Sequence, residues 1–390
     1  MLNNKIFDKI IAYSFGVVLS MPLLSNWLGS IFTYLVYLIS IFGSIYLFAK
    51  YKPNFTTLDI PFFLFIIAAL LSVFSSISPN ITTELLFLPL IISLYIGAKA
   101  IIISNLLEEV LTGMTTIFLI FSTYLMVQLF NFSFNYGLYY LNSNTSNKVE
   151  YLTMSIYAGI VMIYSFYKIK TLWIKYFLVI YTVFMIVVSG ARFSIFFIVI
   201  FFLSIFIGRS RSIKYFFKIL FSTLVILIVS VNLANSLDKK SLHKLESTFD
   251  FTYNRLSHFN ASNNSLKGRV NAIDKSIVAI NKKPFLGYGL NSSPEVINFI
   301  YPHNLFLEAW QDTGILGIFS LIILVICTLI ALIKLFNNKS IHYLLIIYIY
   351  IFLSHLKSFS IFHSTLFFTF TSLILTYYIL EVQNNKKGLK

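Results

Sequence analysis

The sequence predicts an all-helical membrane protein with about twelve transmembrane helices and one large loop outside the bilayer. Of its 390 residues, 58% are hydrophobic and only 11% are charged, and the mean hydropathy is +0.84. A soluble chain of this composition would have too little polar surface to cover itself. Apolar runs of about 20 residues, the length that a helix needs to cross a bilayer, recur along the chain. The alternating segments of about ten residues that a transmembrane barrel needs do not occur.

Each predicted helix is an apolar run that ends at polar or charged residues. The runs cover residues 10–25, 29–49, 58–78, 84–104, 110–130, 151–167, 171–189, 191–208, 214–235, 305–333, 341–356 and 361–380. They divide the chain into transmembrane helices over 1–235, a loop over 236–304, and further helices with a tail over 305–390. An even number of crossings places both termini on the same side of the membrane.

Positive charges set the predicted orientation. The segments assigned to the cytoplasm, including the one that contributes Lys99, hold 17 Lys and Arg residues, whereas the short outer segments hold 3. Lys and Arg are enriched in the cytoplasmic loops of membrane proteins. We therefore expect both termini in the cytoplasm and the long loop on the outer face. Because this asymmetry explains most of the net charge of +15, we do not expect nucleic acid as a partner.

The loop over 236–304 is the long stretch between the predicted spans, and loops of that length are usually functional or disordered. Apolar residues keep helical spacing at Val270, Ile273, Ile277 and Ile280, which predicts an amphipathic helix over 270–280. The Pro and Gly residues of 284–289 predict a turn. We expect a small folded lid. Its nine Lys and Arg residues outnumber its five acids, which favours an anionic ligand.

Arg192 stands between two apolar runs with almost no polar loop around it. An arginine beside a transmembrane span is costly unless it pairs or faces a wet cavity. Its planar guanidinium can donate two parallel hydrogen bonds to a phosphate, whereas a lysine acts as a point charge. Arg192 is therefore a candidate phosphate ligand. The alternative interpretation is a side chain that only reaches the membrane interface.

Three basic residues of the loop are further candidates. Arg269 follows Gly268 at the start of the predicted helix, and Arg255 and Lys267 rank below it. The alternative for each of them is a solvated surface charge.

His303 lies between Pro302 and the helix predicted to begin at residue 305. Pro302 marks a helix boundary, and Asn304 is expected to cap the helix. An imidazole, with an ordinary pKa of about 6.5, can accept a proton from a hydroxyl or orient a phosphate. Glu308 either suits the positive end of the helix dipole or holds the histidine or an acceptor hydroxyl. The alternative for His303 is a histidine satisfied at the membrane interface.

Several kinds of site are missing from the sequence. It contains no Asp-x-Asp pair or His/Glu cluster with metal-ligand spacing, no phosphate-binding loop and no nucleotide fingerprint. The single cysteine, Cys327, lies in an apolar run, so no disulfide is available. We expect a site that uses no metal ion or other cofactor and takes no nucleotide-activated donor.

Several of these residues form a pattern that resembles the O-antigen ligase/polymerase superfamily, bacterial inner-membrane enzymes with many spans and one large periplasmic loop. The pattern consists of Ser189-Gly190-Ala191-Arg192, Gly268-Arg269 followed by Pro284-x-x-Gly287-x-Gly289, and Pro302-His303-Asn304-x-x-Leu307-Glu308 with Gly314-x-x-Gly317. The last of these pieces is the most specific.

The resemblance implies glycan transfer from an undecaprenyl-pyrophosphate donor to a sugar hydroxyl on the periplasmic face, with inversion at the anomeric carbon. By position, Arg192 and Arg269 correspond to the family's pyrophosphate-binding arginines, and His303 corresponds to its essential loop histidine. Further substrate contacts are expected from Asn304, Glu308, Arg255 and Lys267.

The form of the histidine motif favours a polymerase, which joins repeat units of O-antigen or capsule, over a ligase, which moves finished glycan onto lipid A-core. The rival from another class is a lipid-linked glycan flippase or other transporter. The lack of an acidic residue near mid-membrane argues against ion-coupled transport. The expected partners are the lipid-linked donor, the glycan acceptor and the bilayer, with a chain-length regulator as an open further partner.

Overall fold

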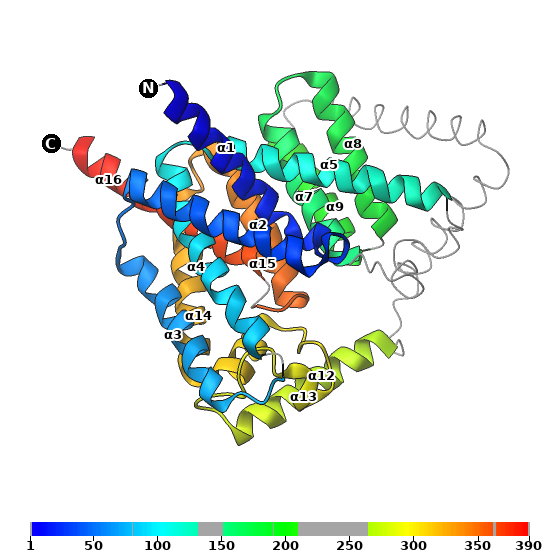
Figure 1. Cartoon of the computed structure of the whole chain (residues 1–390). Coiled ribbons are helices and arrows are strands. Elements are labelled where there is room, and N and C mark those ends of the chain that lie inside the picture. The colour runs from blue at the N-terminus through cyan, green and yellow to red at the C-terminus, as the bar shows by residue number, and fades with distance from the viewer. Residues whose placement is uncertain are drawn as a thin grey trace. The chain divides into compact units, whose positions relative to one another are not determined.

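The computed structural model describes residues 2–79, 81–131, 151–189, 191–209, 264–361 and 364–388, and every regular element in those ranges is a helix (Figure 1). A helix lies at each predicted span except 214–235, which falls outside the described residues. Among the described helices, eight are long and apolar enough to cross a membrane. The all-helical membrane class is confirmed. The count of twelve spans and the side on which the long loop lies stay predictions.

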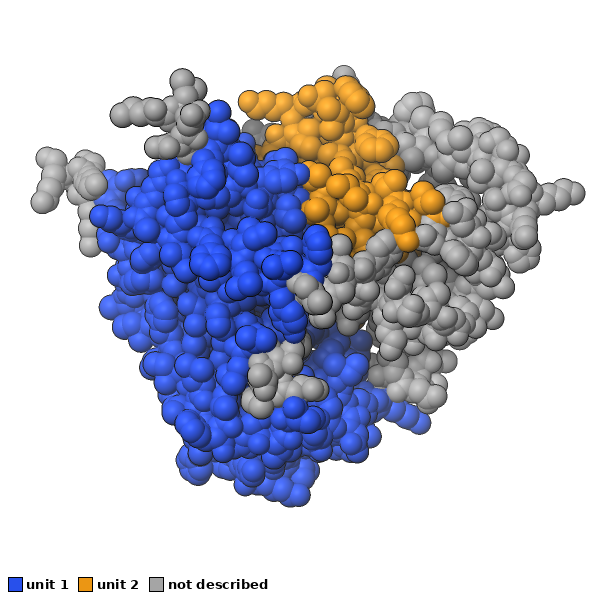
Figure 2. Space-filling model, in the orientation of Figure 1, with its two compact units in different colours: residues 1–21, 29–114, 260–390 blue, residues 22–28, 115–259 orange. Residues whose placement is uncertain are grey.

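The chain divides into two compact units, which Figure 2 shows in different colours. Unit 1 comprises residues 1–21, 29–114 and 260–390, and unit 2 comprises residues 22–28 and 115–259. The helices with residues in unit 1 are α1 (Leu2–Leu19), α2 (Met21–Tyr51), α3 (Ile60–Ser72), α4 (Ile81–Ile103), α5 (Leu107–Asn131), α12 (Asn264–Lys282), α13 (Ser293–Ile297), α14 (Leu305–Leu335), α15 (His342–Lys357) and α16 (Thr365–Gly388). The helices that lie within unit 2 are α7 (Tyr151–Lys168), α8 (Leu172–Ser189) and α9 (Arg192–Arg209), and α2 and α5 also contribute residues to it.

In unit 1, α3 packs against α14, α4 packs against α16, and α12 packs against both α13 and α14. Helices in lipid associate through van der Waals contact and interhelical hydrogen bonds, because lipid tails are as apolar as the side chains. One such bond joins α16 to α4, where the Ser372 hydroxyl donates to the Tyr95 carbonyl at 2.6 Å. The lid helix α12 packs on this bundle through α14.

The first helix boundary differs from the prediction. The sequence predicted spans over 10–25 and 29–49, with a break near residues 26–28. The structure instead ends α1 at Leu19 and begins α2 at Met21, with Pro22 in its first turn. A proline is favoured there because its missing N–H would have no partner in the first turn. The long apolar run hid this boundary.

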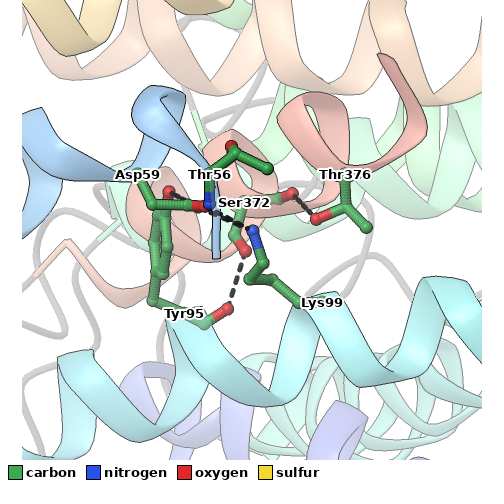
Figure 3. Close-up of polar contacts among 6 residues, drawn as sticks. All are labelled: Thr56, Asp59, Tyr95, Lys99, Ser372 and Thr376. Carbon is green, nitrogen blue, oxygen red and sulfur yellow. Dashed lines mark hydrogen bonds and ion pairs between the residues drawn. The ribbon is translucent and has the colours of Figure 1, made fainter. Parts of the chain in front are cut away.

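A buried ion pair crosses the inside of unit 1 (Figure 3). The Lys99 ammonium of α4 lies 2.7 and 2.8 Å from the two carboxylate oxygens of Asp59, and both side chains are 1% exposed. The Tyr95 hydroxyl also donates to Asp59, at 2.9 Å, and the Thr56 N–H donates at 2.7 Å. Lys99 had been counted among the cytoplasmic flanking charges. The structure instead buries its carbon stem and ammonium inside the helix bundle, so Lys99 is not an exposed flanking charge, and the orientation of the chain stays a prediction.

Candidate functional site

The lid helix is longer than predicted, and its buried face differs from the predicted one. Helix α12 spans Asn264–Lys282, so Arg269 lies inside the helix rather than at its start. The structure buries Ala272, Ser276, Ala279 and Ile280 of this helix, whereas Val270 and Ile277 are 56% and 44% exposed. Small side chains allow close packing of one helix on another. The predicted position Ile280 is buried, but small residues replace Val270 and Ile277 on the buried face, and a pattern that counts only large apolar residues misses them.

Helix α14 is interrupted at Gly314, which adopts φ 68° and ψ −163°. Only glycine takes this conformation readily, because other side chains clash with the backbone there. The interruption frees backbone groups on both sides of Gly314, and each must find another partner. A Cβ atom at Gly314 would overlap the Phe285 carbonyl, which shows how closely the 284–289 turn approaches the break.

The 284–289 turn supplies the partners that the break in α14 requires. The Gln311 carbonyl accepts from the Tyr288 N–H at 2.8 Å, and the Asp312 carbonyl accepts from the Gly289 N–H at 3.0 Å. In return, the Ile315 N–H donates to the Phe285 carbonyl at 3.2 Å. The Pro/Gly turn predicted from the sequence is thus the joint that fixes the lid to the membrane helix.

Side chains of α14 reinforce this joint. The Asp312 carboxylate is fully buried and accepts from the Asn291 N–H at 3.0 Å and from the Ser292 hydroxyl at 2.7 Å. The Trp310 indole N–H donates to the Pro284 carbonyl at 3.2 Å. No role was predicted for these residues, although an acidic residue inside an apolar span was a signal that could have identified Asp312.

His303 sits at the point where the lid meets α14. Asn304 caps the helix as predicted, because its side-chain oxygen accepts from the N–H groups of Phe306 and Leu307 at 3.0 and 3.1 Å. His303 itself has φ 58°, in the left-handed region that non-glycine residues seldom adopt. Its ring meets the Tyr301 ring edge-on, with 4.5 Å between the centroids. His303 therefore lies directly before a capped helix, with its backbone in a strained conformation and its ring in contact with Tyr301.

The imidazole is kept neutral by its surroundings. Burial, with a further contribution from the positive charge of Arg269, lowers the pKa of His303 from 6.5 to about 4. Its Nδ1 atom is buried and has no hydrogen-bond partner among the described residues. A buried polar atom without a partner costs free energy and is expected to meet a ligand or a water molecule. Arg269 thus lies near enough for its charge to act on His303, and these are two of the three residues proposed for the chemistry.

Glu308 faces into the protein. It is 2% exposed, one of its oxygens accepts from the Ser360 hydroxyl, and the other accepts from the Ile361 N–H at 3.2 Å. It therefore ties the segment after α15 to the first turn of α14. This arrangement favours a positioning role over direct contact with substrate.

Arg192 belongs to unit 2, where it begins α9 and is half-buried. The helix is held locally by the Ser194 hydroxyl, which donates to the Ser155 hydroxyl of α7 at 2.9 Å. The Ser189 hydroxyl accepts from the Ala191 N–H at 3.4 Å, which supports the tight connection from α8. Lys267 is exposed on α12, and Arg255 lies outside the described residues.

The described part of the site can supply a neutral imidazole and a guanidinium to one substrate. The imidazole offers one nitrogen as an acceptor and the other as a donor. The guanidinium suits a phosphate or pyrophosphate group. No three His, Cys, Asp or Glu side chains in the described ranges gather closely enough to hold a metal ion.

Comparison with known proteins gives one match. Residues 177–322 match the family model described as O-antigen ligase. Arg192, Arg255, Lys267, Arg269 and the 303–308 motif all fall inside this region. No curated protein and no solved structure matches the chain.

Proposed function

We propose that this chain, which is a member of the O-antigen ligase/polymerase superfamily, polymerises repeat units of O-antigen or capsular polysaccharide. The donor is a glycan on undecaprenyl pyrophosphate, and the acceptor is a sugar hydroxyl on the periplasmic face of the bacterial inner membrane. The observation that supports the proposal is a buried, neutral His303 with a strained backbone, at the joint between the lid and α14 and within range of the charge of Arg269.

In the proposed reaction, the acceptor oxygen attacks the anomeric carbon, and the bond from that carbon to the pyrophosphate oxygen breaks with inversion. The proton of the acceptor hydroxyl passes to His303. The negative charge that develops on the pyrophosphate is stabilised by Arg269, and by Arg192 on the basis of the family pattern. No step requires a metal ion. Asn304 and Glu308 fix the first turn of α14, next to His303, and Lys267 and Arg255 add positive charge near the donor.

Before the donor binds, His303 is only a weak base, because its pKa is about 4. Binding of the anionic donor offsets the charge of Arg269, which is one of the two causes of that low pKa. The histidine therefore becomes more basic when the donor is in place. This coupling would restrict proton transfer to the loaded enzyme.

A second candidate is the ligase reaction, after which the matching family model is described. Both reactions would use the same donor chemistry and differ in the acceptor. A glycan gel separates them, using a strain that lacks this protein and is complemented with wild type, His303→Ala, Arg269→Ala or Arg192→Ala at equal expression.

We expect the three variants to lose long glycan and to keep a single repeat on lipid A-core. Loss of all glycan from lipid A-core, with polymer collecting on the lipid carrier, would identify a ligase. An unchanged ladder in all three variants would refute the assignment of these residues and restore the transporter as the better explanation.

A further inference from the structure

The lid contains an open cleft of about 580 Å³ that the proposed chemistry does not use. Its polar lining consists of Asp274, Lys275, Lys282, Tyr288, Glu295 and Asn298. We propose that this cleft binds an uncharged, hydroxyl-rich part of the growing glycan and keeps the polymer on the enzyme between transfers. The inference rests on the proposed polymerase function.

The cleft lies on the side of α12 that faces away from Arg269. It is lined by Asp274, Val278 and Lys282 of α12, which recur every four residues and so share one side of that helix. A helix turns by about 100° per residue, so Val278, nine residues after Arg269, points to the opposite side. Along the axis the cleft begins about 8 Å and ends about 20 Å beyond Arg269, at ~1.5 Å per residue. It therefore suits a distal part of the polymer rather than the reacting sugar.

The charges in the cleft are balanced, with two carboxylates and two ammonium groups. An anionic ligand would be repelled by the two carboxylates, and a cationic ligand would be repelled by the two ammonium groups. Lys275 is already engaged, because its ammonium donates to the Ile297 carbonyl at 3.3 Å and lies 5.5 Å from the centre of the Phe299 ring. Asp274 and Glu295 remain exposed on the rim as hydrogen-bond acceptors.

Those acceptors match the chemistry of a sugar. A carboxylate accepts hydrogen bonds from two hydroxyl groups at once, and such charge-assisted bonds are stronger than neutral ones. The Asn298 amide can both donate and accept, as each sugar hydroxyl can. A neutral glycan thus finds partners in the cleft without meeting a repelling charge.

The cleft is also preorganised around Tyr288. Its N–H donates to the Gln311 carbonyl at 2.8 Å, and its hydroxyl donates to the Ala279 carbonyl at 3.3 Å. The Lys283 ammonium lies 4.8 Å from the centre of its ring. Because the ring is fixed before a ligand arrives, little conformational entropy is lost when an apolar sugar face packs against it.

The test uses the full chain in proteoliposomes with its lipid-linked repeat unit. The variant is Asp274→Asn/Glu295→Gln, which keeps the shape of the cleft and removes both negative charges. Asn298→Gly provides a second variant that tolerates the left-handed backbone at this position, φ 58°. The matched control is Asn271→Ala, an exposed residue of α12 one turn outside the cleft.

Two quantities are measured: the length distribution of the product, and binding of the oligosaccharide released from the host's own lipid-linked glycan by mild acid. We expect the double variant to make shorter polymer and to bind the oligosaccharide about tenfold more weakly, with an unchanged rate of the first transfer. Unchanged length and binding in both variants would overturn the inference. An equal loss in the first transfer would also overturn it, because the cleft would then belong to the reacting site.

The two proposals fail in different ways in this experiment. If the wild-type protein makes no polymer, the proposed function fails, while the binding measurement still tests the cleft. If the wild type makes polymer and the cleft variants match Asn271→Ala in both quantities, only the further inference fails.

Discussion

Replacing Lys99 with Met tests whether the buried ion pair of unit 1 holds the bundle together. The change keeps most of the apolar stem, one atom shorter, and removes the ammonium that lies 2.7 and 2.8 Å from the Asp59 oxygens. Asp59 would then be a buried carboxylate without a counter-charge. Breaking one side of a buried pair costs about 3–5 kcal/mol. We expect the lower end of that range, about 3 kcal/mol, because Tyr95 and Thr56 still donate to the carboxylate.

The double variant Lys99→Met/Asp59→Asn separates charge from packing. It removes both charges and keeps the side-chain volumes nearly constant, so we expect it to recover most of the stability lost in Lys99→Met. The assay is reversible denaturation of the purified protein in mixed micelles, followed by helix content. A suitable comparison is Lys9→Met, which breaks the pair between Lys9 and Glu109, whose side chains are 54% and 22% exposed. Its loss should be much smaller.

The reasoning would be refuted if the single and double variants at Lys99 were equally unstable. In that case lost packing, rather than an uncompensated charge, would be the cause. An effect of Lys99→Met no larger than that of Lys9→Met would contradict the claim that burial gives the pair its importance.

Three further predictions concern the lid and its joint. The value of kcat/KM should stay constant as the pH falls toward about 4, because the imidazole is neutral above the pKa of His303. In the residual activity of Arg269→Ala, that pKa should be higher and the loss of activity should begin at higher pH. An unchanged pH profile would contradict the electrostatic effect of Arg269 on His303. Gly314→Ala should lower the free energy of unfolding by about 1–3 kcal/mol and increase the rate at which a protease cleaves the lid. The control is Gly268→Ala, which should be tolerated because its Cβ would meet only the Phe299 ring, at 3.9 Å. Asn304→Ala should cost about 1 kcal/mol in thermal denaturation, and Asn304→Asp should restore the cap; equal losses in both would show that the cap is not the cause.

The sequence predicted the features that depend on local composition. Apolar runs predicted the helices of the bundle. Pro302 and Asn304 predicted the start of α14, because the effects of a proline and of a capping residue act within one turn of a helix. The boundary between α1 and α2 at Ser20 was not predicted, because the residues on both sides of it are apolar.

Features that depend on contacts between distant segments could not be predicted in the same way. The break at Gly314 is stabilised by the 284–289 turn, so its conformation is set by residues far away in the sequence. The burial of Ala279 and the exposure of Ile277 depend on which helix lies beside α12. The pairing of Lys99 with Asp59 likewise requires α3 and α4 to be neighbours, although a lysine inside an apolar run was a sign that some partner existed.

The most direct test of the account is a transfer assay with the purified protein in proteoliposomes, supplied only with its undecaprenyl-pyrophosphate-linked repeat unit. The account predicts that wild-type protein converts the donor into a ladder of lipid-linked polymer, and that His303→Ala lowers the rate by at least about 100-fold. Consumption of donor only when lipid A-core is added would contradict the polymerase assignment. A ladder formed equally fast by His303→Ala would contradict the role given to the histidine.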